Sequence, residues 1–346
     1  MHLEIKNKIE RELYSFIRDI DRLYHLNSIS PILFKNIKEF LCRKGKRVRP
    51  ILFVIGYLGY AKKTAQGLYR SAVSIELLHD FMLVHDDIID KSDTRRGKPS
   101  MHALLNRYLK GYKDIKFTGE DLTIVAGDVM YAMALYAFLS IKEDKQRKEN
   151  ALKKLIQAAL YTGSGEFLEL IYGLKQIDCL SLRDIYKVYD LKTANYTFAS
   201  PLTIGATLAG ANKSETERLF KYGIYLGRAF QIKDDILGLF SEEAEIGKSN
   251  LADIQEAKKT ILLWYAYSHA VPQEKRDIER ILSKKNVKRM DLLEMRRIVS
   301  NSGALDYATK QVQEMLKDAN KIHAALRMNP KYKKLLACYS QKILSL

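Results

Sequence analysis

Cysteine, proline and strand-like patterns are all scarce in this sequence. The three cysteines, Cys42, Cys179 and Cys338, stand alone, without the paired spacing of a zinc site or of a disulfide framework. Each of the six prolines can lie at the edge of a helical segment. Stretches in which apolar and polar residues alternate are nearly absent, which argues against a sheet. These absences favour an all-α protein without structural zinc or disulfide bonds.

No hydrophobic run is long enough to suggest a membrane span. The longest, residues 51–61, falls well short of the roughly 20 residues that a bilayer requires. The N-terminal segment is charged throughout, unlike a signal peptide. We therefore expect a cytoplasmic protein with no transmembrane segment.

Basic residues outnumber acidic ones, and the formal net charge is +17. Such an excess can serve nucleic acids, anionic membrane surfaces or small anionic substrates. Residues 275–297 are densely basic but also carry acidic side chains, so we expect an exposed pair of helices joined by salt bridges. No nucleic-acid-binding motif accompanies the charge, and we predict no nucleic-acid partner.

Apolar residues recur at helical spacing along most of the chain. The pattern predicts a helix that begins near residue 9, a second opened by Pro31, and others over residues 47–60 and 67–91. Later helices are predicted over residues 121–142, 147–173, 181–200, 214–240, 255–271 and 303–327, with a loop at 241–254. No linker or repeat divides them, so the predicted fold is one large helical bundle domain over residues 1–346.

A cluster of carboxylates ends the helix predicted over residues 67–91. In a helix, Asp86 and Asp90 point the same way, about 40° apart around the axis, whereas Asp87 lies about 100° round. Like charges so placed repel one another unless a cation joins them, and carboxylate oxygens suit Mg²⁺. A pair of arginines follows at once, which suggests that the metal is shared with a phosphate group. An exposed acidic helix end is the simpler alternative.

A second carboxylate pair, Asp234 and Asp235, lies inside an apolar helical stretch, with Gln231 one turn earlier. Carboxylates in apolar surroundings need compensation. Either a metal ion or the neighbouring Lys233 could supply it.

Two further elements are weaker on their own. Lys46 and Arg49 lie three residues apart near a predicted helix start, where charge and free N–H groups favour an anion. Short basic runs before helices are nevertheless common. Lys192 and Thr193 place a cation and a hydroxyl inside a helix, which by itself indicates little.

Taken in order along the chain, these elements resemble the trans-isoprenyl diphosphate synthase family, the head-to-tail prenyltransferases. KGKRVRP at residues 44–50 is similar to a basic motif of that family, and the first acidic cluster with its arginines is similar to the family's first aspartate-rich region. Counterparts follow in the same order for AGD at 126–128, KTA at 192–194, QIKDD at 231–235, GK at 247–248 and DIQEAKKT at 253–260. The resemblance implies the isoprenoid synthase fold, a helical bundle around a central cavity, and a homodimer.

The resemblance also assigns roles to residues of this chain. It implies a site for several Mg²⁺ ions at Asp86, Asp90 and Asp234, with Asp87 and Asp235 in secondary roles. It implies an allylic diphosphate site made of Arg95, Lys192, Thr193, Gln231, Lys248 and Lys258. It implies an isopentenyl diphosphate site made of Gly45, Lys46, Arg49, His79 and Arg96. The residues expected to act in catalysis are Asp86, Asp90, Asp234, Lys192 and Thr193.

The implied reaction joins isopentenyl diphosphate to an allylic diphosphate. Mg²⁺ and the nearby cations neutralise the departing diphosphate, and the double bond of isopentenyl diphosphate attacks the resulting allylic cation. The released diphosphate is expected to take the proton that is then lost, so no side chain is assigned as general base.

Two positions depart from the family pattern. Gly238 stands where the second region normally has a third carboxylate, and Glu166 stands where a glutamine is usual. These changes leave open a catalytically weak regulatory subunit of a heteromeric prenyl synthase, although the first region is intact. A terpene cyclase is a further option, but it would leave His79 and Arg96 without a co-substrate.

Product length is expected to depend on the helix that carries the first cluster. Phe81 and Met82 lie one to two turns before Asp86, where they could floor the cavity or simply pack in the core. In the family, a bulky aromatic residue five positions before the first aspartate resembles archaeal geranylgeranyl synthases. We therefore predict a C20 product, geranylgeranyl diphosphate, with C15 (farnesyl) and C25 products as alternatives.

Overall fold

The computed structural model describes residues 1–241 and 251–345. Contacts between Cα atoms group the chain into two compact units. Unit 1 comprises Met1–Leu155, Ile204–Ala211 and Asn329–Leu335, and unit 2 comprises Ile156–Thr203, Asn212–Met328 and Leu336–Leu346. The single domain expected from the sequence stays a prediction.

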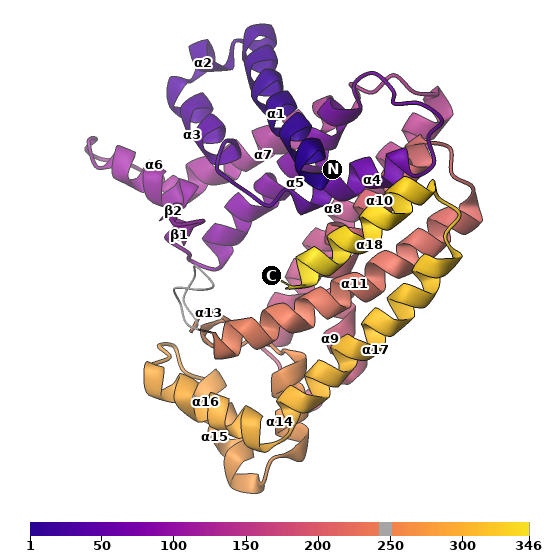
Figure 1. The fold of residues 1–346 in the computed structure, drawn as a ribbon. Coiled ribbons are helices and arrows are strands. Elements are labelled where there is room, and N and C mark those ends of the chain that lie inside the picture. Colours follow the sequence, from indigo (N-terminus) through magenta and orange to yellow (C-terminus); the bar gives the residue numbers. More distant parts are fainter. Residues whose placement is uncertain (242–250, 346) are drawn as a thin grey trace. The chain divides into compact units, whose positions relative to one another are not determined.

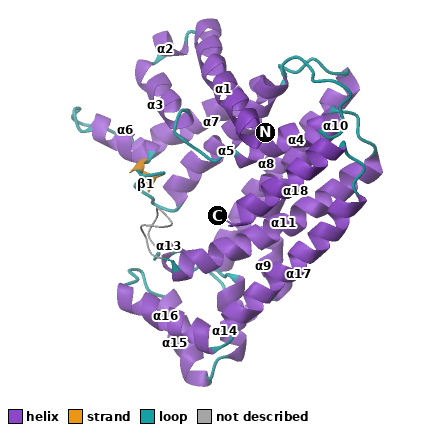
Figure 2. Cartoon of the chain, viewed as in Figure 1, coloured by secondary structure: helices purple, strands orange, loops and turns teal. Residues whose placement is uncertain are grey.

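The regular structure of the described residues is almost entirely helical, which confirms the all-α class (Figures 1 and 2). The first helices are α1 (His2–Tyr24), α2 (Leu26–Ile29), α3 (Pro31–Leu41), α4 (Val48–Leu58), α5 (Leu68–Ile89), α6 (Met101–Leu109), α7 (Gly119–Phe138) and α8 (Lys145–Gly173). The short 3₁₀ helix η1 (Ile177–Cys179), α9 (Leu182–Val188), the π-helix η2 (Tyr189–Ala199), α10 (Ser200–Leu208) and α11 (Lys213–Phe240) come next. The last are α13 (Ala252–Gln255), α14 (Ile261–His269), α15 (Pro272–Leu282), α16 (Arg289–Asn301), α17 (Ala304–Ala325) and α18 (Pro330–Ser345).

The long helix α5 forms the centre of unit 1, where it packs against α1, α4 and α7. Its apolar side chains Val73, Leu77 and Val84 are fully buried, as helical spacing predicts. Gly67, with φ of 82°, precedes its first residue, and a Cβ there would lie 2.2 Å from the Ser140 carbonyl oxygen. Only glycine fits this position, so the start of α5 is fixed by the sequence.

The end of α5 is held close to α7 by a second glycine. A Cβ at Gly127 would lie 2.3 Å from His85 Nε2, and that nitrogen lies 3.1 Å from the Ile124 carbonyl oxygen. His85 immediately precedes the first acidic cluster. The close approach therefore anchors the cluster's helix end against α7.

In unit 2, α11 packs against both η2 and α17. A Cβ at Gly227 would lie 2.3 Å from the Ala194 Cα, and one at Gly223 would lie 2.4 Å from the Ala199 Cα. These glycines let η2, which carries Lys192 and Thr193, lie directly against α11.

Several boundaries differ from those predicted. The region expected as one helix over residues 181–200 divides into α9 and the π-helical η2, and the helix expected over 255–271 begins only at Ile261. Helices α6 and α18 were not predicted, and most of the expected loop at 241–254 lies outside the described residues. The predicted pair of helices joined by salt bridges is confirmed as α15 and α16, with Arg280 2.7 Å from Glu294.

Among the described helices, α7 alone is long and apolar enough to cross a membrane, judged by length and composition. Its buried residues, which include Met130 and Met133, lie on a helix that packs against α5 and α6. Buried core helices pass the same test, so this is weak evidence for a membrane span.

Candidate active site

The first acidic cluster lies at the C-terminal end of α5 in unit 1. Asp90 caps the helix, with its N–H bonded to the Asp86 carbonyl at 2.8 Å, so the two carboxylates belong to one helical turn. Both side chains are half-buried, whereas that of Asp87 is fully buried. The predicted division between Asp86 and Asp90 on one face and Asp87 on another is thus seen in the structure.

Asp87 binds the first of the arginines that follow the cluster. Arg95 Nε donates to Asp87 Oδ1 at 2.6 Å and Arg95 Nη2 lies 2.5 Å from the same oxygen, while Nη2 is 3.5 Å from Asp86. Burial raises the pKa of Asp87, and the Arg95 guanidinium opposes that shift. Asp87 therefore fixes Arg95 beside Asp86, where an anion bound to the cluster would meet it.

A tight hairpin presents both arginines. Strands β1 (Thr94–Arg95) and β2 (Lys98–Pro99) pair antiparallel, and Arg96 and Gly97 between them have φ of 54° and 71°. Positive φ at both central residues is the geometry of a type I′ turn, which suits the twist of paired strands. Arg95 is therefore the last residue of β1, and Arg96 is the first residue of the turn.

Two of the predicted isopentenyl diphosphate residues, Arg49 and Arg96, lie near Asp80 on α5. Arg96 Nη2 lies 3.5 Å from Asp80 Oδ1, and the Arg96 guanidinium carbon is 3.6 Å from where a Gly45 Cβ would stand. Burial, followed by the charges of Arg49 and Arg96, lowers the pKa of His79 well below its usual value. Burial and Glu76 raise the pKa of Asp80 to about 8.

Arg47 was not singled out from the sequence, yet it is the most buried cation of this region. Its side chain is fully buried, with Nη1 2.6 Å from Glu76 and Nε 2.8 Å from Glu10. Its Nη2 also donates to the carbonyls of Leu41 and Arg43 at 3.1 and 2.9 Å. Arg47 thereby joins α1, α3 and α5 beneath the basic motif, and Lys46 beside it stays exposed.

The second group of predicted residues lies in unit 2, on η2 and α11. Lys192 forms ion pairs with Glu166 at 2.6 Å and with Glu169 at 2.5 Å, both from α8. A Cβ at Gly165 would lie 2.8 Å from the backbone nitrogen of Lys192, so glycine allows α8 and η2 to meet. Glu166, a departure from the family pattern, thus has a defined partner within unit 2.

A chain of hydrogen bonds runs from Thr193 into α11. The Thr193 hydroxyl donates to Gln231 Oε1 at 2.6 Å, and Gln231 Nε2 donates to Asp235 Oδ1 at 2.9 Å. The Tyr189 hydroxyl also donates to Asp235 and accepts the N–H of Ile261 at 2.9 Å. Burial and Asp235 raise the pKa of Tyr189 well above its usual value.

Asp235 is therefore buried and compensated by Tyr189 and Gln231, whereas Asp234 is exposed. Lys233, the alternative source of compensation, donates to the Leu344 carbonyl. Lys258 forms an ion pair with Glu256 at 2.6 Å. Lys248 lies outside the described residues.

Comparison with known proteins places these motifs in a family. A family model described as polyprenyl synthetase matches residues 30–299. A short chain isoprenyl diphosphate synthase of Methanocaldococcus jannaschii is 32% identical over 304 residues, covering 88% of this chain and 84% of that protein. This chain belongs to the polyprenyl synthetase family. A geranylgeranyl diphosphate synthase of Sulfolobus acidocaldarius is also similar, at 30% identity over 89% of this chain and 88% of that protein.

The fold of this polyprenyl synthetase is shared with a solved structure. The crystal structure of geranylgeranyl pyrophosphate synthase from Corynebacterium glutamicum, complexed with isoprenyl diphosphate and magnesium, matches with a TM-score of 0.89. The two are 24% identical, and the match covers 99% of this chain and 98% of that one. The predicted isoprenoid synthase fold and prenyltransferase identity are confirmed.

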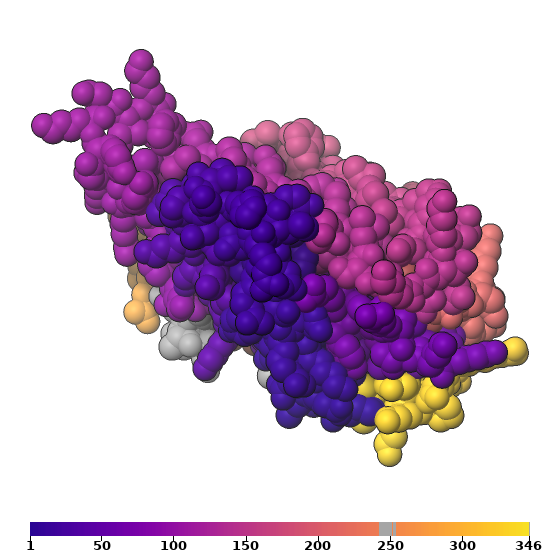
Figure 3. Space-filling view, turned by 90° about the horizontal axis from the view of Figure 1, so that it is seen from above, coloured from indigo at the N-terminus to yellow at the C-terminus, as the bar shows by residue number. Residues whose placement is uncertain are grey.

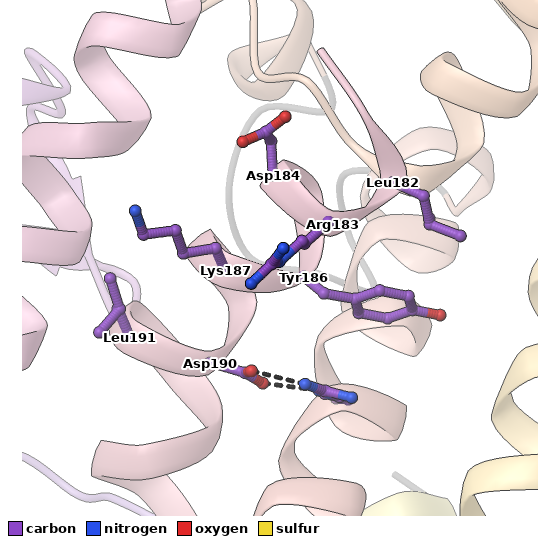
Figure 4. A pocket seen from close by; sticks show the side chains of 8 residues that line it. Leu182, Arg183, Asp184, Tyr186, Lys187, Asp190 and Leu191 are labelled. Carbon is purple, nitrogen blue, oxygen red and sulfur yellow. Dashed lines mark hydrogen bonds and ion pairs between the residues drawn. The ribbon is translucent and has the colours of Figure 1, made fainter.

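A wide-mouthed pocket of this polyprenyl synthetase lies in unit 2, beside η2 and α11, with a volume of about 890 Å³ (Figure 4). The carboxylate of Asp190 binds Arg228 through two bonds of 2.6 and 2.5 Å, and the Tyr186 ring lies 4.9 Å from the Arg228 guanidinium. Its lining includes none of the predicted site residues.

Proposed function

We propose that this protein condenses isopentenyl diphosphate with an allylic diphosphate, head to tail, and releases geranylgeranyl diphosphate (C20). The observation that carries the proposal is the end of α5, where Asp86 and Asp90 belong to one turn and Arg95 is held beside them by Asp87. Hard oxygen ligands next to a fixed guanidinium suit a diphosphate that shares its metal with the protein.

The residues present fit Mg²⁺. The carboxylates of Asp86 and Asp90 are half-buried oxygens on one helical turn, while Asp87 is already bound by Arg95. We propose that Asp86, Asp90 and Asp234 bind Mg²⁺. When bound, the metal supplies positive charge that stabilises the leaving diphosphate.

The basic residues are proposed to divide between the two substrates. Arg95, Lys192 and Gln231 bind the allylic diphosphate, and Thr193 orients Gln231 through the hydrogen bond of 2.6 Å. Lys46, Arg49 and Arg96 bind isopentenyl diphosphate, and Gly45 lies beside Arg96. His79 acts there as a neutral imidazole, because burial and the arginines lower its pKa. Lys248 and Lys258 are further proposed contacts of the allylic diphosphate.

Phe81 is proposed as the floor that limits the product to C20. Its ring lies 5.2 Å from that of Tyr131 on α7 and 4.8 Å from that of His85, so it is braced across two helices of unit 1. Phe81→Ala should lengthen the product, and Met82→Ala should do so less. Chromatography of the products decides the matter, since an unchanged distribution for Phe81→Ala would exclude this residue as the floor.

The protein is also proposed to be a cytoplasmic homodimer that pairs through α8. Leu160 and Phe167, seven residues apart on α8, are 64% and 68% exposed and form one apolar stripe, and Leu174, just past the end of α8, is 84% exposed. Phe167→Glu should produce monomers in light scattering. Phe220→Glu, at an exposed position of α11, is the matched control and should leave the dimer intact.

The direct test is an assay of the purified protein alone with Mg²⁺, labelled isopentenyl diphosphate and farnesyl diphosphate. A labelled C20 diphosphate, lost on addition of a chelator, is the expected result. Absence of any condensation product would overturn the proposal. Activity that returns only with a second, different subunit would identify a regulatory or partner subunit instead.

A further inference from the structure

A short exposed segment at the far end of α6 combines apolar and basic side chains. We call residues 107–118 the tip; it ends α6 and leads into α7 (Figure 2, far left). Of its residues, Leu109 is buried and all the others are exposed. The exposed side chains include Tyr112 at 56% and Phe117 at 49%. The segment as a whole projects from the surface (Figure 3, upper left).

The base of the tip is firmly anchored. The Gly119 N–H donates to Asn106 Oδ1 at 2.7 Å, and Asn106 Nδ2 donates to Glu120 at 3.1 Å. A Cβ at Gly119 would lie 2.4 Å from the His102 carbonyl oxygen, so α6 and α7 meet closely there. Thr118 adds a capping box with Asp121 at the start of α7. The tip is therefore presented outward by a defined base.

Basic residues are interleaved with the apolar ones. The sequence RYLKGYKDIKFT contains the cations Arg107, Lys110, Lys113 and Lys116 and the single acid Asp114. An exposed apolar or aromatic residue (Tyr108, Tyr112, Ile115 or Phe117) accompanies each cation. A group of exposed apolar side chains gathered on one segment is typical of a surface that binds a protein or a membrane.

We propose that the tip docks this protein on the surface of an anionic lipid bilayer. Lysines attract anionic headgroups, while aromatic and aliphatic side chains enter the region between headgroups and acyl chains. Tyrosine suits that boundary because its ring is apolar and its hydroxyl is polar. The formal net charge of +17 for the whole chain favours the same kind of surface.

A bilayer fits the tip better than a nucleic acid does. Tyr108 and Tyr112 share a hydrogen bond of 2.6 Å between their hydroxyls, and their rings are tilted by 55° at 5.4 Å. Bases stack best on aromatic faces that lie open and parallel to them. Ile115 adds an aliphatic side chain that a bilayer can bury but that base stacking does not use.

Docking of this kind would suit the proposed product. Geranylgeranyl diphosphate has a charged head and a long apolar chain, so it partitions to membranes. The docking proposal, however, rests on the tip itself and not on the reaction.

The experiment measures binding of the full-length protein to vesicles. We expect sedimentation with vesicles of phosphatidylcholine and phosphatidylglycerol, weakened by salt, and none with phosphatidylcholine alone. Replacing Lys110, Lys113 and Lys116 by Gln should weaken binding on the order of a hundredfold. The matched control replaces the exposed Lys213, Lys221 and Lys317 by Gln and should change binding little.

Insertion of the tip into the bilayer is measured separately, by fluorescence and by a second binding assay. The Phe117→Trp variant should show a blue shift of its emission with the anionic vesicles, and Phe117→Ser should weaken binding about tenfold or more. Failure of the wild type to bind, or equal losses in both lysine triples, would overturn the proposal. So would binding of single-stranded RNA that the tip lysines control while vesicle binding stays unchanged.

Condensing activity without vesicles should be unchanged in all the tip variants. The two proposals can therefore fail independently. An inactive protein that binds vesicles through the tip contradicts only the proposed function, and an active one that does not bind contradicts only the docking.

Discussion

The ends of α5 and α11 carry similar aspartate pairs but treat them differently. In each pair the second carboxylate, Asp87 or Asp235, is buried and bound by the fold, while the first remains more accessible. Asp87 is bound by a cation, Arg95, and Asp235 accepts hydrogen bonds from the neutral groups of Tyr189 and Gln231. Each pair thus separates into an accessible aspartate, which we propose for ligand binding, and a buried aspartate that the fold binds.

The largest expected effect is on activity, at the first aspartate of α5. Asp86→Asn removes a proposed metal ligand and should lower kcat roughly a hundredfold to a thousandfold. Its free energy of unfolding should stay within about 0.5 kcal/mol of the wild type. Steady-state kinetics and urea unfolding give both values, and wild-type kcat in this variant would refute the role of Asp86.

For Asp87, the second aspartate of α5, we expect the main effect on the free energy of unfolding. Asp87→Ala leaves the Arg95 guanidinium without its closest partner, so we expect a loss of about 2–3 kcal/mol in the free energy of unfolding. Asp87→Asn, which keeps an oxygen acceptor, should recover part of it. Two variants as stable as the wild type would mean that the Asp87–Arg95 pair is not structural.

On α11, the hydrogen bonds that Asp235 accepts from Tyr189 and Gln231 can be removed one at a time. Tyr189→Phe deletes the hydroxyl that bonds Asp235 and Ile261, which should cost about 1–3 kcal/mol. Tyr186→Phe loses a less buried bond to Gln311 of 3.0 Å and serves as control. Equal losses in the free energy of unfolding for the two variants would contradict a larger structural role for the Tyr189 hydroxyl.

The smallest effect concerns His79, which lies on α5 about two turns before Asp86. Because its folded pKa is lowered, the unfolded chain binds a proton more readily below about pH 6.5, and stability falls as pH falls. His79→Gln should lose about 1–2 kcal/mol less than the wild type between about pH 7 and about pH 5. The exposed His25→Asn is the control and should follow the wild-type pH profile.

Local patterns in the sequence were enough to predict α5 and the faces on which its aspartates lie. Gly67 and the apolar stripe define the helix, and helical geometry alone separates Asp86 and Asp90 from Asp87. The family resemblance supplied the remaining roles. These depend on residues whose chemistry can be recognised one motif at a time.

Long-range pairings could not be predicted in the same way. Arg47 binds Glu10 and Glu76, which are 37 and 29 residues away in the sequence, and no periodic pattern predicts such a network. Glu166 departs from the family pattern, and the sequence did not reveal that it pairs with Lys192. The close packing of η2 on α11 likewise depends on Gly223 and Gly227, and helix propensity does not encode such a contact.

The central claim, that the first aspartate of α5 binds metal and the second holds Arg95, can be tested by metal binding itself. Electron paramagnetic resonance would follow Mn²⁺, standing in for Mg²⁺, in the presence of inorganic diphosphate. The account predicts that Asp86→Asn loses the bound Mn²⁺ signal while Asp87→Asn keeps it. Equal retention in both variants, or loss only in Asp87→Asn, would contradict the account.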